Sequence, residues 1–112
     1  MKKDLEKEVE AVKELFIASL SSMSFLQRRF LPVRAAGARG LAKKIIGFAS
    51  QRMQAARTLD ELAFYSDLEE AGRQLLVSCY DGSLHVPPEE FLATLIKIEY
   101  LLAKLEDEED GR

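Results

Sequence analysis

The sequence is poor in the residues that build reactive or cross-linked sites. Cys79 is the only cysteine, His85 is the only histidine, and there is no tryptophan. A single cysteine excludes an intramolecular disulfide, and the Cys/His spacing of a zinc site is missing. We therefore expect a reducing, cytoplasmic setting, with no metal ion and no cofactor.

Cys79 and His85 allow two interpretations. We favour the one in which Cys79 is a small buried hydrophobic residue near a helix end and His85 lies in a loop at 82–87. In the other, the two residues form a catalytic pair, but no third group is evident that would orient the histidine. Walker, HExxH and EF-hand patterns are also missing. We therefore expect a protein that is not an enzyme and assign no catalytic residue.

Long hydrophobic runs are missing too. The longest, residues 15–26, has 12 residues, four of them serines. This is shorter than the roughly 20 apolar residues that a membrane-spanning helix needs. Acidic residues precede it, whereas a signal peptide begins with basic ones. We expect the run to lie inside a helix, and we expect no membrane partner and no small-molecule substrate.

The proportions of hydrophobic and charged residues are those of an ordinary globular protein. Of its 112 residues, 47% are hydrophobic and 31% are charged, which is enough for one folded core. We expect a single helical-bundle domain at 1–105. Five consecutive acids at 106–110 predict an acidic disordered tail at 106–112.

Apolar residues recur at spacings of three and four throughout, and no stretch alternates for long enough to form a strand. The pattern predicts an all-α, up-and-down four-helix bundle with helices at roughly 3–30, 34–57, 59–80 and 88–107. The fourth helix shows the pattern well. Its predicted core residues are Phe91, Leu95, Ile98, Leu102 and Leu105, with Leu92 and Ile96 beside them.

The predicted first helix is the longest. Its stripe keeps a heptad spacing for almost four heptads, through Leu5, Val9, Val12, Phe16, Ser19, Met23, Leu26 and Phe30. An apolar stripe that outruns the other helices would need a partner, so we expect a homodimer. Alternatively, this helix is kinked, or its charged start protrudes and frays.

Local signals mark the helix ends. Thr58 followed by Glu61 is a capping box, and its repetition eight residues later predicts a break near 65–66 in the third helix. Pro87 and Pro88 mark the start of the fourth. Two glycines, Gly37 and Gly40, either delay the start of the second helix to about residue 40 or let another backbone pass closely.

The least ordinary feature is the distribution of charge. Residues 15–59 hold no acidic residue, whereas residues 60–112 hold fourteen acids and four bases. Eight bases fall in the first range, and we take them as candidates for binding a polyanion or a partner: Arg28, Arg29, Arg34, Arg39, Lys43, Lys44, Arg52 and Arg57. We favour internal pairing with an acidic neighbouring helix. An interface with another subunit or protein is the second explanation, and nucleic acid is the third.

Together these observations favour a non-enzymatic helical interaction module that associates with itself and binds protein partners through helix faces. The alternative is a small nucleic-acid-binding protein, or a subunit of a nucleoprotein complex, that uses the basic second helix. Against it stand a calculated pI of about 5.2 and the lack of aromatic residues interleaved with the bases. A small-molecule site inside the bundle ranks last.

Overall fold

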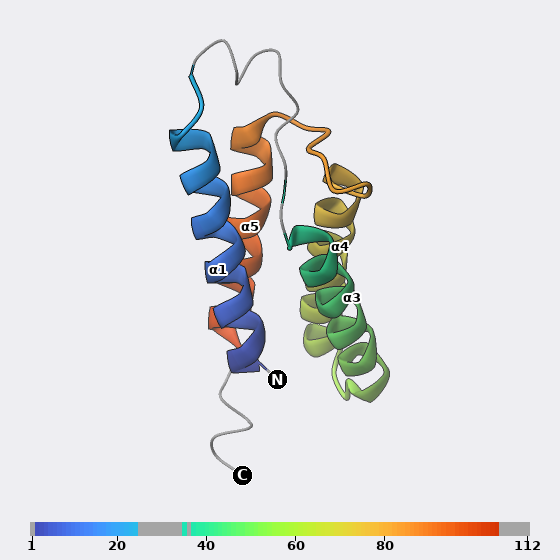
Figure 1. Ribbon diagram of the computed structural model, residues 1–112. Helices are drawn as coiled ribbons and strands as arrows, with labels where there is room; N and C mark the ends of the chain where they lie inside the picture. The colour runs from blue at the N-terminus through green and yellow to red at the C-terminus, as the bar shows by residue number, and fades with distance from the viewer. Residues whose placement is uncertain (1, 25–34, 36, 106–112) are drawn as a thin grey trace.

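The fold is an all-α bundle of four helices, seen in a computed structural model that describes residues 2–24, 35 and 37–105. Figure 1 shows α1 and α4 running in one direction and α3 and α5 in the other, so the predicted up-and-down arrangement is confirmed. The helices are α1 (Lys2–Ser21), α3 (Ala38–Ala55), α4 (Leu59–Ser78) and α5 (Pro88–Lys104). Each helix contacts its two neighbours in the ring α1–α3–α4–α5, and the α3–α4 contact is the most extensive.

The first helix is shorter than the predicted range 3–30. It ends at Ser21, and residues 22–24 do not continue it, while residues 25–30 lie outside the described residues. Ser22 supplies part of the reason, because its hydroxyl donates to the carbonyl of Ser19 at 2.9 Å, a local bond that competes with helix formation. Since α1 and α4 both have 20 residues, the length argument for a homodimer does not hold.

The second predicted helix, 34–57, spans only Ala38–Ala55 in α3. Gly37 stands immediately before it with φ 79°, a left-handed conformation that glycine adopts without a steric penalty. Gly40 lies within the helix, and a Cβ added there would meet nothing within 4 Å. The late start that the glycines suggested is therefore present, but it falls at Ala38 rather than near residue 40, and no other described element lies within 4 Å of a Cβ added at Gly40.

The third helix is continuous, so the predicted break near 65–66 is wrong. Tyr65 and Leu68 are both buried on either side of that point, and this packing keeps α4 in one piece. The capping box at its start is confirmed, because the Thr58 hydroxyl accepts from the backbone N–H of Glu61 at 3.1 Å. The Glu61 carboxylate reaches back to the N–H of Arg57.

The fourth helix begins at Pro88, as predicted, and ends at Lys104 rather than at residue 107; residues 106–112 lie outside the described residues. Phe91, Leu95, Ile98 and Leu102 are fully buried. Ile96 was expected beside this core but is 53% exposed.

The core runs along the centre of the ring. It contains residues from the predicted apolar stripe of every helix, including Leu5 and Val9 of α1 and Ile45 of α3. Ser19 of the α1 stripe is exposed, and Leu26 and Phe30 lie outside the described residues. None of the described helices is both long and apolar enough for a membrane span. The four outer helix faces and the grooves between neighbours are therefore the surfaces on which a functional site has to be sought.

Candidate functional site

The basic candidates that the structure describes do not form one patch. Arg39 and Lys43 are exposed on successive turns of α3, and Arg57 follows the end of that helix. The guanidinium carbon of Arg52 lies 4.9 Å from the centre of the Phe48 ring, and this ring belongs to the core. Arg28, Arg29 and Arg34 lie outside the described residues.

Lys44 shows that part of the basic charge is neutralised internally. Its Nζ lies 2.8 Å from Oε1 of Glu8 on α1. Lys44 therefore pairs within the molecule, but its partner is on α1 and not on the acid-rich helices that follow in the sequence. Within the part of the chain that the structure describes, Arg39 and Lys43 form no ion pair, so these two cations remain candidates for an external anion.

Cys79 and His85 are not arranged for catalysis. Cys79 is fully buried, its thiol donates to the carbonyl of Leu75 at 3.0 Å, and burial raises the pKa of this thiol. A reactive cysteine needs the opposite, a lowered pKa and access to solvent. His85 instead binds Asp81, with Nε2 2.7 Å from Oδ1, and stacks on Tyr80 with ring centres 4.6 Å apart. The favoured interpretation of Cys79 as a buried hydrophobic residue is therefore confirmed.

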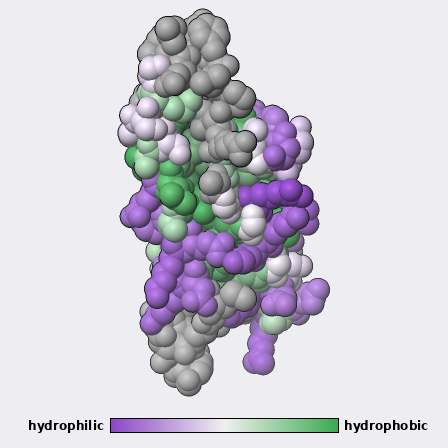
Figure 2. Space-filling view, in the orientation of Figure 1, coloured by the Kyte–Doolittle hydropathy of each residue, from purple (hydrophilic) through white to green (hydrophobic). Residues whose placement is uncertain are grey.

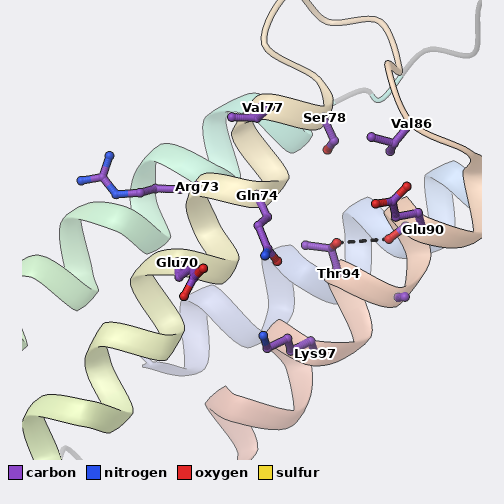
Figure 3. A pocket seen from close by; sticks show the side chains of 10 residues that line it. Glu70, Arg73, Gln74, Val77, Ser78, Val86, Glu90, Thr94 and Lys97 are labelled. Atoms are coloured by element: carbon purple, nitrogen blue, oxygen red, sulfur yellow. Dashed lines mark hydrogen bonds between the residues drawn. The ribbon is translucent and has the colours of Figure 1, made fainter.

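An open groove of about 650 Å³ separates α4 from α5. Figure 3 shows Gln74 of α4 pointing toward Thr94 of α5, and Val77 and Val86 near one end. The hydroxyl groups here already donate to their own helices, Ser78 to the Leu75 carbonyl and Thr94 to the Glu90 carbonyl. Glu70, Arg73, Glu90 and Lys97 place charges of both signs around it, so the groove has no single electrostatic preference.

No buried side-chain polar atom is left without a hydrogen bond among the residues that the structure describes. The same residues contain no group of three or more His, Cys, Asp or Glu side chains that could hold a metal ion. A catalytic or metal centre would have to be assembled from such groups.

The outer face of α5 is unusual because it carries a second apolar stripe. We define the α5 outer face as Ala93, Ile96, Tyr100 and Ala103, which are spaced 3, 4 and 3 and are all exposed. Ile96 is 53% and Tyr100 is 58% exposed. At 3.6 residues per turn this stripe lies on the side of the helix away from the buried stripe. Lys104 sits at its end, with Nζ 4.6 Å from the centre of the Tyr100 ring.

The second half of α1 adds to this exposed apolar surface. Lys13 on α1 binds Glu99 on α5 at 2.9 Å, which fixes the alignment of the two antiparallel helices. Because the helices are antiparallel, Ile17, four residues after Lys13, lies level with about residue 95 of α5 and therefore close to the level of Ile96. The Ile17 side chain is 45% exposed. Figure 2 shows the hydrophobic surface gathered over the upper part of α1, with hydrophilic side chains below it.

The α5 outer face has a signal in the sequence, the spacing of Ile96 and Tyr100. Periodicity places Ile96 beside the core stripe of this helix, whereas the structure leaves its side chain 53% exposed. The spacing of Ile96 and Tyr100 indicates a second stripe, but only the lateral positions of α1 and α4 decide which of the two stripes is covered.

Comparison of the chain with protein-family models, with curated proteins and with solved structures finds no match.

Proposed function

We propose that the protein is a non-enzymatic helical interaction module that binds a protein partner through the α5 outer face and the adjoining part of α1. The observation that carries this proposal is the heptad-like spacing of the exposed Ile96 and Tyr100 on a helix whose other side already fills the core. Folding requires one apolar side of a bundle helix, not two.

Isolated exposed hydrophobic residues are ordinary, so the spacing matters more than the exposure. On α4, the exposed Leu59 and Leu62 lie in the first turn and Val77 lies in the last, and the charged Glu70 and Arg73 separate them. On α5, Ile96 and Tyr100 lie in the middle of the helix, with Ala93 one turn before Ile96 and Ala103 one turn after Tyr100, so that the exposed apolar stripe extends over about three turns. Stripes of this kind are what helix-on-helix recognition uses.

Site-specific photo-crosslinking inside cells tests the proposal. A photoreactive amino acid replaces either Ile96 or Tyr100, and Leu59, which is 82% exposed on α4, provides a matched control position. We expect the same protein adduct from positions 96 and 100 and none from 59. We also expect the adduct from position 100 to disappear when Ile96→Glu is added. No adduct, or identical adducts from all three positions, would refute the proposal.

The nucleic-acid alternative has one specific observation in its favour. Arg39 and Lys43 are like charges at i and i+4, an arrangement that slightly destabilises a helix, and both are exposed. A phosphate between them would relieve that repulsion. Titration of labelled RNA and DNA at several salt concentrations tests this. The logarithm of the association constant should fall linearly with the logarithm of the salt concentration, with a slope of about −0.9 for each duplex DNA phosphate that the protein neutralises. The double variant Arg39→Gln with Lys43→Gln should then lose binding, and its persistence would reject this site.

A further inference from the structure

We propose that the partner on the α5 outer face is a second copy of this chain, with the two α5 helices packed antiparallel about a twofold axis level with Ile98. This inference rests on the proposed function, because it uses the same face. It adds the identity of the partner, the direction of packing and the residues that meet.

The first argument is the order of side-chain sizes. Read in either direction, the α5 outer face is small, large, large, small: Ala93, Ile96, Tyr100, Ala103. In a twofold interface, whenever residue i meets residue j, residue j meets residue i. An antiparallel pair centred at position 98 places Ile96 against Tyr100 of the second copy, and Ala93 against Ala103. The stripe is therefore complementary to its own reversed copy.

The second argument is the charge at the two ends of α5. Glu89 and Glu90 occupy the first turn, and Lys104 occupies the last. Antiparallel packing centred at 98 brings Lys104 level with residue 92 of the second copy, about 3 Å along the axis from Glu90 at a rise of 1.5 Å per residue. Opposite charges then meet at both ends, whereas a parallel pair would bring like charges together. Charges at the edge of an interface determine the orientation of the partners more than they increase the affinity.

The outer face of α3 lacks this symmetry. The outer side of α3 carries Arg39 and Lys43 on neighbouring turns, and two copies of that face would repel each other. Lys97 borders the α5 outer face near the proposed axis, where the second copy contributes the same charge. We therefore expect weak association rather than a permanent dimer.

Sedimentation equilibrium of the full chain, from about 1 µM to 1 mM, covers the range in which such association is measurable. We expect a monomer–dimer equilibrium whose dissociation constant rises at least about tenfold in Ile96→Glu, since a charge would be buried in the contact. Leu59→Glu adds the same charge on α4 and should leave the constant unchanged. Circular dichroism of each variant confirms that the helices are retained.

Charge exchange and cross-linking test the direction. Lys104→Glu should weaken the dimer, and adding Glu90→Lys to it should restore the association. For cross-linking, chains carrying Ile96→Cys are mixed with chains carrying Tyr100→Cys. Disulfides form only when the Cα atoms are within about 7 Å. In the proposed dimer, position 96 lies level with position 100 of the second copy, so the mixture should cross-link efficiently. Chains carrying Ile96→Cys alone should cross-link less, because their two cysteines would be four residues, or about 6 Å, apart along the helix axis.

The outcomes separate this inference from the proposed function. A strict monomer over the whole range, together with a photo-crosslinked adduct to a different protein, overturns the inference and leaves the function standing. A monomer that gives no adduct removes both. A dimer that is unaffected by Ile96→Glu, or that cross-links better through Ile96→Cys alone, overturns the proposed face or the proposed direction.

Discussion

The two halves of the bundle, α3 with α4 and α1 with α5, are held together by different means. Between α3 and α4 the helices come close because Gly72 has no side chain: a Cβ there would lie 3.0 Å from Ile45 Cγ2 and 3.0 Å from Ile46 Cγ1. Between α1 and α5, two large rings, Phe16 and Phe91, pack with centres 4.5 Å apart.

The two halves differ in how closely their helices approach, although both leave large apolar side chains exposed, such as Leu59 on α4 and Ile96 on α5. Close approach through glycine makes α3–α4 the most extensive contact in the molecule. In the α1–α5 half, the seam is bridged by the ion pair of Lys13 and Glu99, and large apolar side chains remain on the outside. The two halves therefore differ in the means of contact, which is a glycine in one and two aromatic rings with an ion pair in the other.

The largest expected effect is the loss of the aromatic contact. Phe91→Ala should destabilise the fold by about 3–5 kcal/mol, because it removes a fully buried ring and leaves a cavity beside Phe16. Urea unfolding at low protein concentration measures the loss. Tyr100→Ala, an aromatic truncation on the exposed side of the same helix, should cost less than about 0.5 kcal/mol. Equal losses would mean that the rings do not hold the α1–α5 half together.

The next effect tests the close approach in the other half. Gly72→Val should lower the free energy of unfolding by about 1–3 kcal/mol, because the new methyl groups would overpack the contact with Ile45 and Ile46. Gly47→Val is the matched control on α3, since a Cβ there meets nothing within 4 Å. It should change stability by less than about 0.5 kcal/mol. If both variants unfold at the same urea concentration, overpacking against Ile45 and Ile46 does not occur, and the close approach at Gly72 is not what holds α3 and α4 together.

A smaller effect concerns the ion pair in the α1–α5 seam. A double-mutant cycle of Lys13→Met and Glu99→Gln should give a coupling of about 0.2–1 kcal/mol at pH 7. The hydrogen bond to Glu99 raises the pKa of Lys13, against the opposing effect of burial. The stabilisation is therefore fully present below the unfolded pKa of lysine, and it is lost as the pH rises through the raised folded pKa.

The more exposed pair of Lys44 and Glu8, 2.8 Å apart with side chains 61% and 32% exposed, serves as the control cycle. Its coupling should be smaller, since solvent screens it more. Equal couplings in the two cycles would show that the α1–α5 seam has no special electrostatic role.

The sequence was sufficient to predict the four helices, because each carries its own apolar stripe. Helix starts were predicted where a side chain makes the cap, as Thr58 does, or where proline fixes the backbone, as at Pro88. The end of α1 was predicted less well. Met23 continues the apolar spacing and packs against the core, although the helix has already ended at Ser21.

The candidate site was less predictable for a physical reason. Whether Ile96 is buried depends on where the neighbouring helices lie, and periodicity within one helix does not contain that information. The partner of Lys44 also came from a helix 36 residues away, which no local charge pattern indicates. The eight bases fall within residues 28–57 of the sequence, but those that lie on α3 and are described occupy different sides of the helix.

The smallest expected effect lies in the connection between the two halves. Asp81 follows α4, and its Oδ1 accepts from Nε2 of His85 at 2.7 Å and from the N–H of Ser83 at 3.0 Å. The hydrogen bond to His85 and then that from Ser83 lower the pKa of this carboxyl group. The carboxylate therefore stabilises the turn above the unfolded pKa of aspartate, about 3.9, and this contribution is lost as the pH falls through the lowered folded pKa.

Asp81→Asn tests that contribution, because an amide oxygen can still accept from Ser83 while the charge is removed. At pH 7 the variant should melt slightly below the parent protein, and the gap should close as the pH falls below about 4. Thermal unfolding monitored by circular dichroism across that range measures it, with Asp67→Asn on the exposed surface of α4 as the control. A gap that is the same at every pH would mean that the turn depends on the shape of the side chain and not on its charge. The connection would then join the two halves without making their stability sensitive to acid.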